Sequence, residues 1–246
     1  AYTKCTSVEH LSSPAFALER FNLTSLKSLN VRGDMTVTEG MFKDLTSIET
    51  LTIPYIGWNI DATVNTHFGY IFGAKSADEN ASAVPSSLKK VVITGAVEGK
   101  SLEKIDAKAF YGCSSINNII LPKTVKAIGE SAFEGCSALT KMNIPALVTS
   151  IGNSAFSSSG LTSVVIPDSV KTIGMWVFYQ DAKLVSVTLP EALTALPDGL
   201  FNGCKSLTAV SIPRSVEKIG GTVFAHCESL TEIDLPDGLK TIGNSA

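Results

Sequence analysis

Long apolar runs are absent from this sequence of 246 residues. No stretch of roughly 18 or more consecutive apolar residues occurs, which is the length that a membrane-spanning helix needs, so we expect no transmembrane segment. Charged residues make up only 17% of the chain, and the formal net charge is −3 at pH 7. A nucleic-acid-binding domain carries a basic stripe or patch, so this balance excludes nucleic acid as the expected partner.

Catalytic and metal-binding motifs are also missing. The three histidines, His10, His67 and His226, have no partner at metal-ligand spacing. The sequence contains no HExxH, GxSxG or calcium-loop pattern. The stretch VVITGAVEGKS looks like a phosphate-binding loop, but Gly95 and Gly99 are one residue too close for that motif. We therefore predict no catalytic residue, no metal, no cofactor and no enzymatic activity.

The chain instead contains an internal repeat. A phenylalanine recurs every 22 or 23 residues in the second half of the chain, and a proline follows each one in the same rhythm. A fixed period of this length is the signature of a solenoid. The phenylalanines are Phe110, Phe133, Phe156, Phe178, Phe201 and Phe224, and the prolines are Pro122, Pro145, Pro167, Pro190, Pro213 and Pro236.

Each repeat reads I-G-x-x-A/V-F-x-x-C/S-x-x-L-x-x-V-x-I-P-x-x-V-K-x. The segment L-x-x-V-x-I alternates and predicts a short strand with Val and Ile inward, ended by a proline that cannot donate to a ladder. The V-K-x-I-G segment is a candidate second strand. The segment around the phenylalanine is too short for an independent helix, so we expect one helical or 3₁₀ turn with its Phe in the core. Stacked units then bury one continuous core.

The IGxxAFxxC and LxxVxIP motifs of residues 105–246 resemble those of the BspA-like class of leucine-rich repeats. The resemblance implies an α/β fold, a right-handed leucine-rich-repeat solenoid with a parallel concave sheet and short helical or 3₁₀ turns on the convex side. It also implies a secreted or cell-surface protein, often an adhesin, with an extracellular or cell-surface location.

The regular pattern weakens toward the N-terminus. We predict a single solenoid domain over residues 1–246, with an N-terminal cap at 1–20 and regular repeats at 105–246. Residues 55–87 contain two insertions between repeats, with Phe72 as the repeat marker. The last residues, IGNSA, repeat 151–155 and stop inside a repeat, so we expect the natural protein to continue or its cap to lie outside this sequence.

Four of the five cysteines share one repeat position, three residues after the phenylalanine. Other repeats hold Ser159 and Asp181 there. Side chains in register point the same way, which is poor geometry for a disulfide, so we expect buried free thiols rather than disulfides or metal ligands. The four are Cys113, Cys136, Cys204 and Cys227, whereas Cys5 falls outside this pattern.

The first insertion carries large aromatic residues where the repeat requires none. These residues form either a satellite core or a site for a ligand or partner, and the sequence leaves both open. The candidate binding residues are Tyr55, Trp58, His67, Phe68 and Tyr70. Trp176 and Tyr179 are a weaker second candidate, expected to pack on the convex side.

Two triplets match the N-glycosylation pattern, beginning at Asn22 and Asn80. Such triplets arise often by chance. They would carry a glycan only in a protein secreted by a eukaryote.

The outward-facing strand residues are small and mildly polar, and they lack the Trp, Tyr and Arg anchors that dominate binding hot spots. The first function hypothesis is a non-enzymatic, adhesin-like surface or secreted module, monomeric, whose partner is a matrix or host surface protein or a glycan. One alternative is a structural spacer or scaffold. Another is a carbohydrate-binding module that uses the insertion aromatics.

Overall fold

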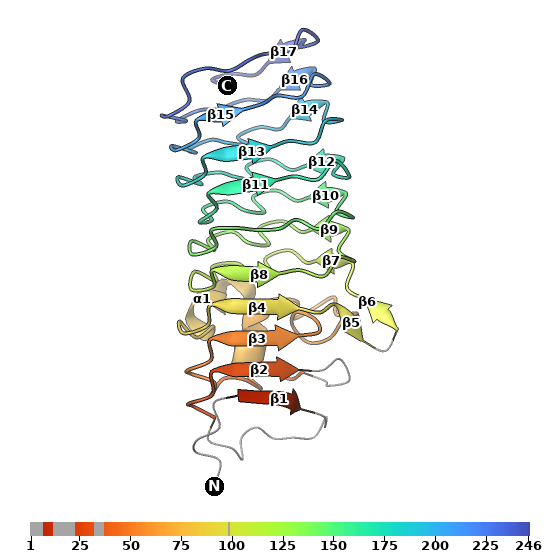
Figure 1. The fold of residues 1–246 in the computed structure, drawn as a ribbon, viewed down its shortest axis with the longest axis vertical. Helices are drawn as coiled ribbons and strands as arrows, with labels where there is room; N and C mark the ends of the chain where they lie inside the picture. Colours follow the sequence, from red (N-terminus) through yellow and green to blue (C-terminus); the bar gives the residue numbers. More distant parts are fainter. Residues whose placement is uncertain (1–6, 12–22, 32–36, 98) are drawn as a thin grey trace.

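The protein is a column of stacked coils, with β1 and β17 at opposite ends (Figure 1). The computed structural model describes residues 7–11 (backbone only), 23–31, 37–97 and 99–246. Most regular coils contribute a strand to a first sheet, a two-residue strand to a second sheet and a segment of turns around the phenylalanine; between β8 and β11 the first sheet continues only as an isolated bridge from Lys141 to Ser163. The predicted solenoid is therefore confirmed. Cys5, Asn22 and most of the predicted cap lie outside the described residues.

The first sheet is parallel, as predicted. Its strands pair in register, so that Leu51 faces Val91 and Val91 faces Ile119 across three strands. All three side chains are buried, because they lie at the inward positions of the alternating pattern. A five-stranded part consists of β1 (Ser7–Leu11), β2 (Ser28–Val31), β3 (Thr50–Ile53), β4 (Lys90–Ile93) and β8 (Asn118–Ile120). A three-stranded part consists of β11 (Ser163–Val165), β13 (Ser186–Thr188) and β15 (Ala209–Val210).

The V-K-x-I-G segments form a second parallel sheet, which confirms the candidate second strand. The glycine that follows most of these strands permits close stacking of the coils: a Cβ on Gly129 would lie 2.5 Å from the backbone nitrogen of Ala107. One part of this sheet contains β7 (Lys104–Ile105), β9 (Ala127–Ile128), β10 (Ser150–Ile151) and β12 (Thr172–Ile173). The other contains β14 (Ala195–Leu196), β16 (Lys218–Ile219) and β17 (Thr241–Ile242).

The segments around the phenylalanines differ from the prediction, because in residues 105–246 they are turns and not helical or 3₁₀ turns. The residues two before and two after the ring, such as Ser131 and Gly135 around Phe133, have φ values of 52° and 73°. A left-handed residue at each of these two positions is incompatible with a continuous helix. The N–H groups of alternate residues therefore point along the column toward the next coil. We call this third side the turn ribbon; it comprises residues 108–112, 131–135, 154–158, 176–180, 199–203 and 222–226.

The turn ribbon joins the coils by its own backbone hydrogen bonds. The N–H groups of Ser131, Phe133 and Gly135 donate to carbonyls of the next coil at 2.9, 2.8 and 2.9 Å. Equivalent bonds recur along the regular coils. The backbone groups that a helix would have paired internally are thus paired between coils instead.

The repeat phenylalanines stack in a ladder through the core. Adjacent rings from Phe110 to Phe224 lie 5.3–5.8 Å apart, with interplanar angles of 5–18°. At the insertion, Phe68 continues the ladder, at 4.9 Å from Phe110. Phe72, the predicted marker, lies beside Phe68 and reaches Phe42 edge-on at 6.3 Å. The sequence therefore predicted the ladder but assigned the wrong ring to this coil.

The four repeat cysteines are free thiols, as predicted, with Cys113, Cys136 and Cys204 buried and Cys227 partly exposed. The thiol of Cys136 donates to the carbonyl oxygen of Phe110 in the preceding coil at 3.1 Å. Cys204 and Cys227 make the same contact, each at 3.1 Å. In three coils this position therefore supplies a thiol donor to the preceding coil.

Candidate functional site

The insertion departs from the column on two sides. On one side the turn ribbon is replaced by three short helical elements, η2 (Phe68–Phe72), η3 (Ala77–Glu79) and α1 (Asn80–Ala83). These are the helices found in the described parts of the chain. On the other side, the loop 56–66 and the hairpin of β5 (Ala96–Val97) and β6 (Lys100–Ser101) project from the column (Figure 1). We call residues 56–66 and 94–102 (residue 98 is not described) the side lobe.

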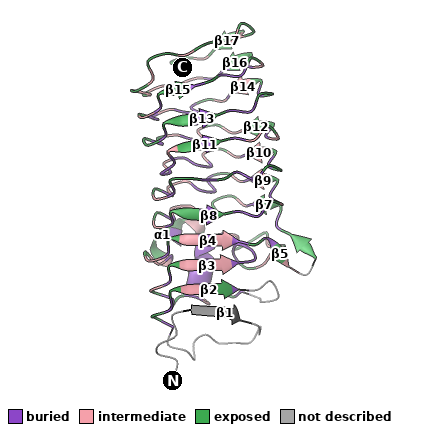
Figure 2. Ribbon diagram, in the orientation of Figure 1, coloured by how far each residue is buried: buried purple, intermediate pink, exposed green. Residues whose placement is uncertain are grey.

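Four of the five predicted binding residues are buried: Tyr55, His67, Phe68 and Tyr70. They fill the space between the insertion and the coils, as a satellite core does, so none is accessible to a partner in this structure. Trp58 differs, because 42% of its surface is exposed. Figure 2 shows exposed residues in the hairpin that projects from the column.

Tyr55 and His67 hold the insertion by polar contacts. The Tyr55 hydroxyl accepts a hydrogen bond from the Val37 N–H at 3.3 Å. Burial raises the pKa of Tyr55, although this hydrogen bond opposes the shift, so the phenol stays protonated. The Nε2 of His67 lies 3.2 Å from the carbonyl oxygen of Ala74 and donates to it. Because that nitrogen is committed and the ring is buried, His67 acts as a packing residue.

Asn80 has a structural role that sequence reasoning missed. It has 0% exposure, and its Oδ1 accepts a hydrogen bond from the Gly69 N–H at 2.7 Å. Its Nδ2 donates to the carbonyl oxygens of Ala109 at 3.4 Å and Lys108 at 3.5 Å. One amide thus clamps η2 to the first regular coil. Its burial also excludes a glycan at this triplet in the folded protein.

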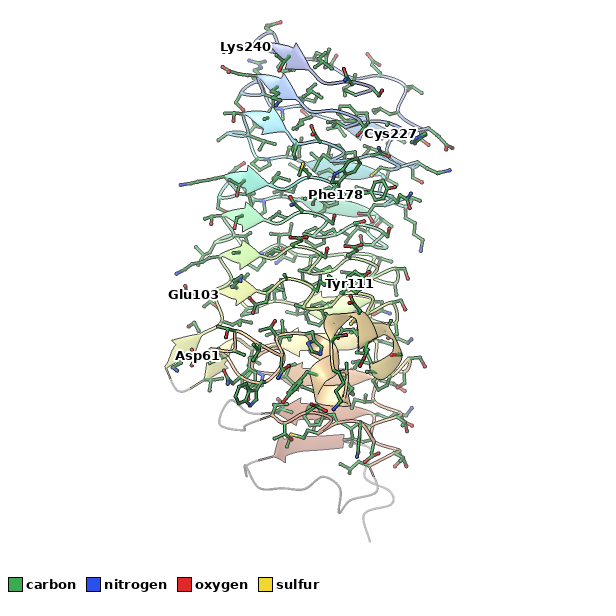
Figure 3. All side chains as sticks on the ribbon, turned by 180° about the vertical axis from the view of Figure 1, so that it is seen from behind. Asp61, Glu103, Tyr111, Phe178, Cys227 and Lys240 are labelled. Carbon is green, nitrogen blue, oxygen red and sulfur yellow. The ribbon has the colours of Figure 1, made fainter. Side chains whose placement is uncertain are left out.

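Close backbone contacts hold the base of the side lobe. The Trp58 N–H donates to the carbonyl oxygen of Asn65 at 3.1 Å. Only glycine fits at position 57, because a Cβ there would lie 1.9 Å from that same oxygen. An ion pair between Lys100 and Asp61 ties the hairpin to the loop, and Figure 3 shows Asp61 on the side of the column opposite Tyr111.

The side lobe presents apolar surface to solvent. Besides Trp58, the side lobe contains Val64, which is 58% exposed. The sequence indicated Trp58 but gave no sign that the hairpin at 96–101 would pair with its loop, since two-residue strands have too little pattern to read.

The rest of the described surface has fewer features that point to a binding or catalytic site. Within the described ranges, no group of three or more His, Cys, Asp or Glu residues could hold a metal ion. In those same ranges no helix is both long and apolar enough to cross a membrane. On the first sheet, the outward residues of the regular coils, such as Ser163 and Ser186, are exposed and mostly small.

The in-register parallel strands, the buried ladder and the period of each coil define a leucine-rich-repeat solenoid. Residues 85–208 and 149–246 match the model of the BspA type leucine rich repeat region, in six copies. The chain belongs to this family. A search of curated proteins found no match.

Three solved structures illustrate the likeness. A leucine-rich repeat protein from Bacteroides ovatus is 28% identical, with a TM-score of 0.65, over 79% of this chain and 48% of that one. The leucine-rich repeat protein of T. pallidum is 33% identical over 58% of this chain and 78% of that one, with a TM-score of 0.48. A leucine-rich cell surface protein from Faecalibacterium prausnitzii is 24% identical over 89% and 69%, with a TM-score of 0.36. This chain thus spans about half the length of the Bacteroides protein.

Proposed function

We propose that this chain is a non-enzymatic, adhesin-like binding module of an extracellular or cell-surface protein, and that it contacts a protein partner through the side lobe. Membership of the repeat family supports a binding role, since stacked repeats offer extended surfaces for partners. The proposed partner is a matrix or host surface protein.

The exposure of Trp58 carries the proposal. Tryptophan is enriched in binding hot spots because it offers a large apolar area together with one polar group. Here the backbone of its loop is held at the base by the Asn65 hydrogen bond and by the close fit at Gly57. A partner would therefore meet a loop whose backbone is already ordered, and binding would lose less conformational entropy there.

The regular coils favour a second role, as the spacer that carries this lobe. Their outward strand residues are small, and the ion pairs between coils, such as Lys126–Glu103 and Lys240–Glu217, lie on exposed surface. Such pairs contribute little to binding or stability. The glycan alternative through the insertion aromatics retains only Trp58, because the other four side chains are buried.

Binding to an array of immobilised extracellular-matrix proteins tests the proposal. We expect Trp58→Ala to weaken binding at least tenfold while the melting temperature stays unchanged. The matched control is Val165→Ser, which removes an apolar side chain with 63% exposure on the first sheet. Binding that Val165→Ser abolishes and Trp58→Ala preserves would move the site to the sheet. No binding by the unmodified chain would favour the spacer role.

A further inference from the structure

We propose that Met175, Trp176, Tyr179 and Gln180, on the turn ribbon, form a second binding site that takes a neutral sugar. This site is separate from the side lobe and goes beyond the protein contact proposed there. Four observations support it. They are the bulky side chain of Trp176 at a left-handed backbone position, the packing of its ring on the next coil, the hydrogen-bonding groups around the ring, and the lack of charged residues in 175–180.

Trp176 occupies a backbone position that disfavours it. Its φ is +61°, in the left-handed region, where a bulky side chain is an outlier. The equivalent residues of the other regular coils are small or flexible: Lys108, Ser131, Ser154, Gly199 and Thr222. The left-handed backbone recurs at this position in the other regular coils, so what sets this coil apart is the bulky aromatic side chain, which the turn does not require.

The indole does not fill the core. That place belongs to Phe178, which is fully buried in the ladder. Trp176 instead lies on Gly199 of the next coil, where a Cβ would come within 2.1 Å of its ring. Tyr179 meets it edge to face, with ring centroids 5.3 Å apart at 88°. Both aromatic residues are partly exposed, so the pair forms an aromatic platform at the surface.

Hydrogen-bonding groups surround this platform. The Nε2 of Gln180 donates to the Tyr179 hydroxyl at 3.0 Å, which leaves the phenolic O–H to donate and the Gln180 Oε1 to accept. The Met175 N–H donates to the Oδ1 of Asn153 at 2.9 Å, which leaves the side-chain N–H groups of Asn153. A sugar presents hydroxyl groups that both donate and accept, so these amide and phenol groups match it.

The platform's own segment carries no charged side chain. Residues 175–180 contain no Asp, Glu, Lys, Arg or His. At the position of Met175 the preceding coil carries Asn153, and the next coil carries Asp198, whose Oδ1 accepts a hydrogen bond from the Gly221 N–H at 2.8 Å. The C–H face of a pyranose packs well on an aromatic ring, whose face is electron-rich. A single coil is too narrow for a standard protein interface of about 800 Å² per partner, whereas one or two sugar rings fit it.

The test uses the whole chain and its two tryptophans. In Trp58→Ala, Trp176 is the only tryptophan left, so its emission reports on this site alone. The probes are soluble oligomers of glucose, mannose, galactose and N-acetylglucosamine. We expect at least one to change the emission saturably. The same sugar should bind the unmodified chain by calorimetry with the same affinity.

Trp176→Ser is the matched variant, because serine already stands at this position as Ser131 and Ser154, so the fold is kept. It should weaken sugar binding at least tenfold without lowering the melting temperature. Tyr179→Phe, which keeps the ring and removes the hydroxyl, should weaken binding severalfold. The proposal is overturned if no probe binds the unmodified chain, or if Trp176→Ser binds a probe as tightly as the unmodified chain does. Either result leaves the protein contact at Trp58 untouched.

Discussion

Asp181 and Cys204 occupy the same position of adjacent coils, each three residues after a ladder phenylalanine and each with 0% exposure. The thiol of Cys204 donates to the carbonyl oxygen of Phe178. The carboxyl oxygens of Asp181 have no well-formed hydrogen bond in the described chain. Burial raises the pKa of Asp181 well above its usual range, and Ser159 in the preceding coil offsets this only in part. Burial thus favours the protonated, uncharged form of Asp181 in the folded protein.

The first prediction is a stability that falls as pH rises. Unfolded Asp181 ionises above pH about 4, whereas the folded group keeps its proton, so folding takes up a proton over the range between the two pKa values. The free energy of unfolding should then fall by up to about 1.4 kcal/mol per pH unit above pH about 4. Urea unfolding of the unmodified chain at pH 5 and at pH 8 measures this slope.

The titratable groups beside Asp181 are the thiols of Cys136 and Cys204, whose own pKa values its charge would raise, so they stay neutral over this range. Asp181→Cys, which introduces the residue that the next coil carries as Cys204, should flatten the slope. Asp237→Asn, at an exposed carboxylate, should leave it unchanged. Equal slopes in the unmodified chain and in Asp181→Cys would show that Asp181 is not the group responsible.

A second prediction concerns the phenylalanine ladder. Phe156 is fully buried between Phe133 at 5.3 Å and Phe178 at 5.8 Å. Phe156→Ala should lower the free energy of unfolding by about 3–5 kcal/mol, as other truncations of buried phenylalanine do. Phe224→Ala, at a partly buried ring, should cost less. A denaturation midpoint of Phe156→Ala equal to that of the unmodified chain would mean that the ladder is not central to the core.

A third prediction concerns the thiols. Burial raises the pKa of Cys136 to about 12, and that of Cys227 to about 11. Since the thiolate is the reactive form, a thiol reagent at pH 8 should label the folded chain slowly and the urea-unfolded chain fast. Replacing Cys5 by Ser beforehand confines the assay to the repeat cysteines. Rapid labelling of Cys136 in the folded state would contradict its burial.

Replacement of these thiols should also be mild. Cys136→Ser should melt within a few degrees of the unmodified chain, with or without a reductant, because Ser159 already stands at the equivalent position. A reductant that lowers the melting temperature of the unmodified chain would reveal a disulfide.

A fourth prediction concerns Asn80. Asn80→Ala leaves the Gly69 N–H without its acceptor in a buried place, which costs about 1–3 kcal/mol for the segment involved. Hydrogen exchange should speed up in residues 67–84, while residues 105–246 keep their protection. Asn118→Ala, at an exposed strand residue, is the control. Faster exchange across all coils would show that the clamp supports the whole column and not only the insertion.

The structural features that recur from coil to coil could be predicted from the sequence. The registers of the two sheets, the ladder from Phe110 to Phe224 and the free thiols all follow from one residue type recurring at one position. The turn ribbon escaped prediction because Ser131 and Trp176 adopt left-handed backbone without being glycine, which no local pattern reveals. The structure of the insertion could not be predicted because it occurs only once in the chain. No neighbouring residue distinguishes Phe68 from Phe72 as the ring that joins the ladder. The Lys100–Asp61 ion pair joins residues that are far apart in the sequence.

Hydrogen bonds between coils run along the length of the column in both sheets and in the turn ribbon (Figure 1). A force that pulls the two ends apart would therefore stretch these bonds directly, and it would load the interfaces between coils one after another in series. Under such tension the strength of the whole protein is that of its weakest interface. The two interfaces that flank the coil of Phe156, where Ser159 and Asp181 stand in place of the thiol donor, should therefore rupture at a lower force than those bridged by Cys136, Cys204 and Cys227.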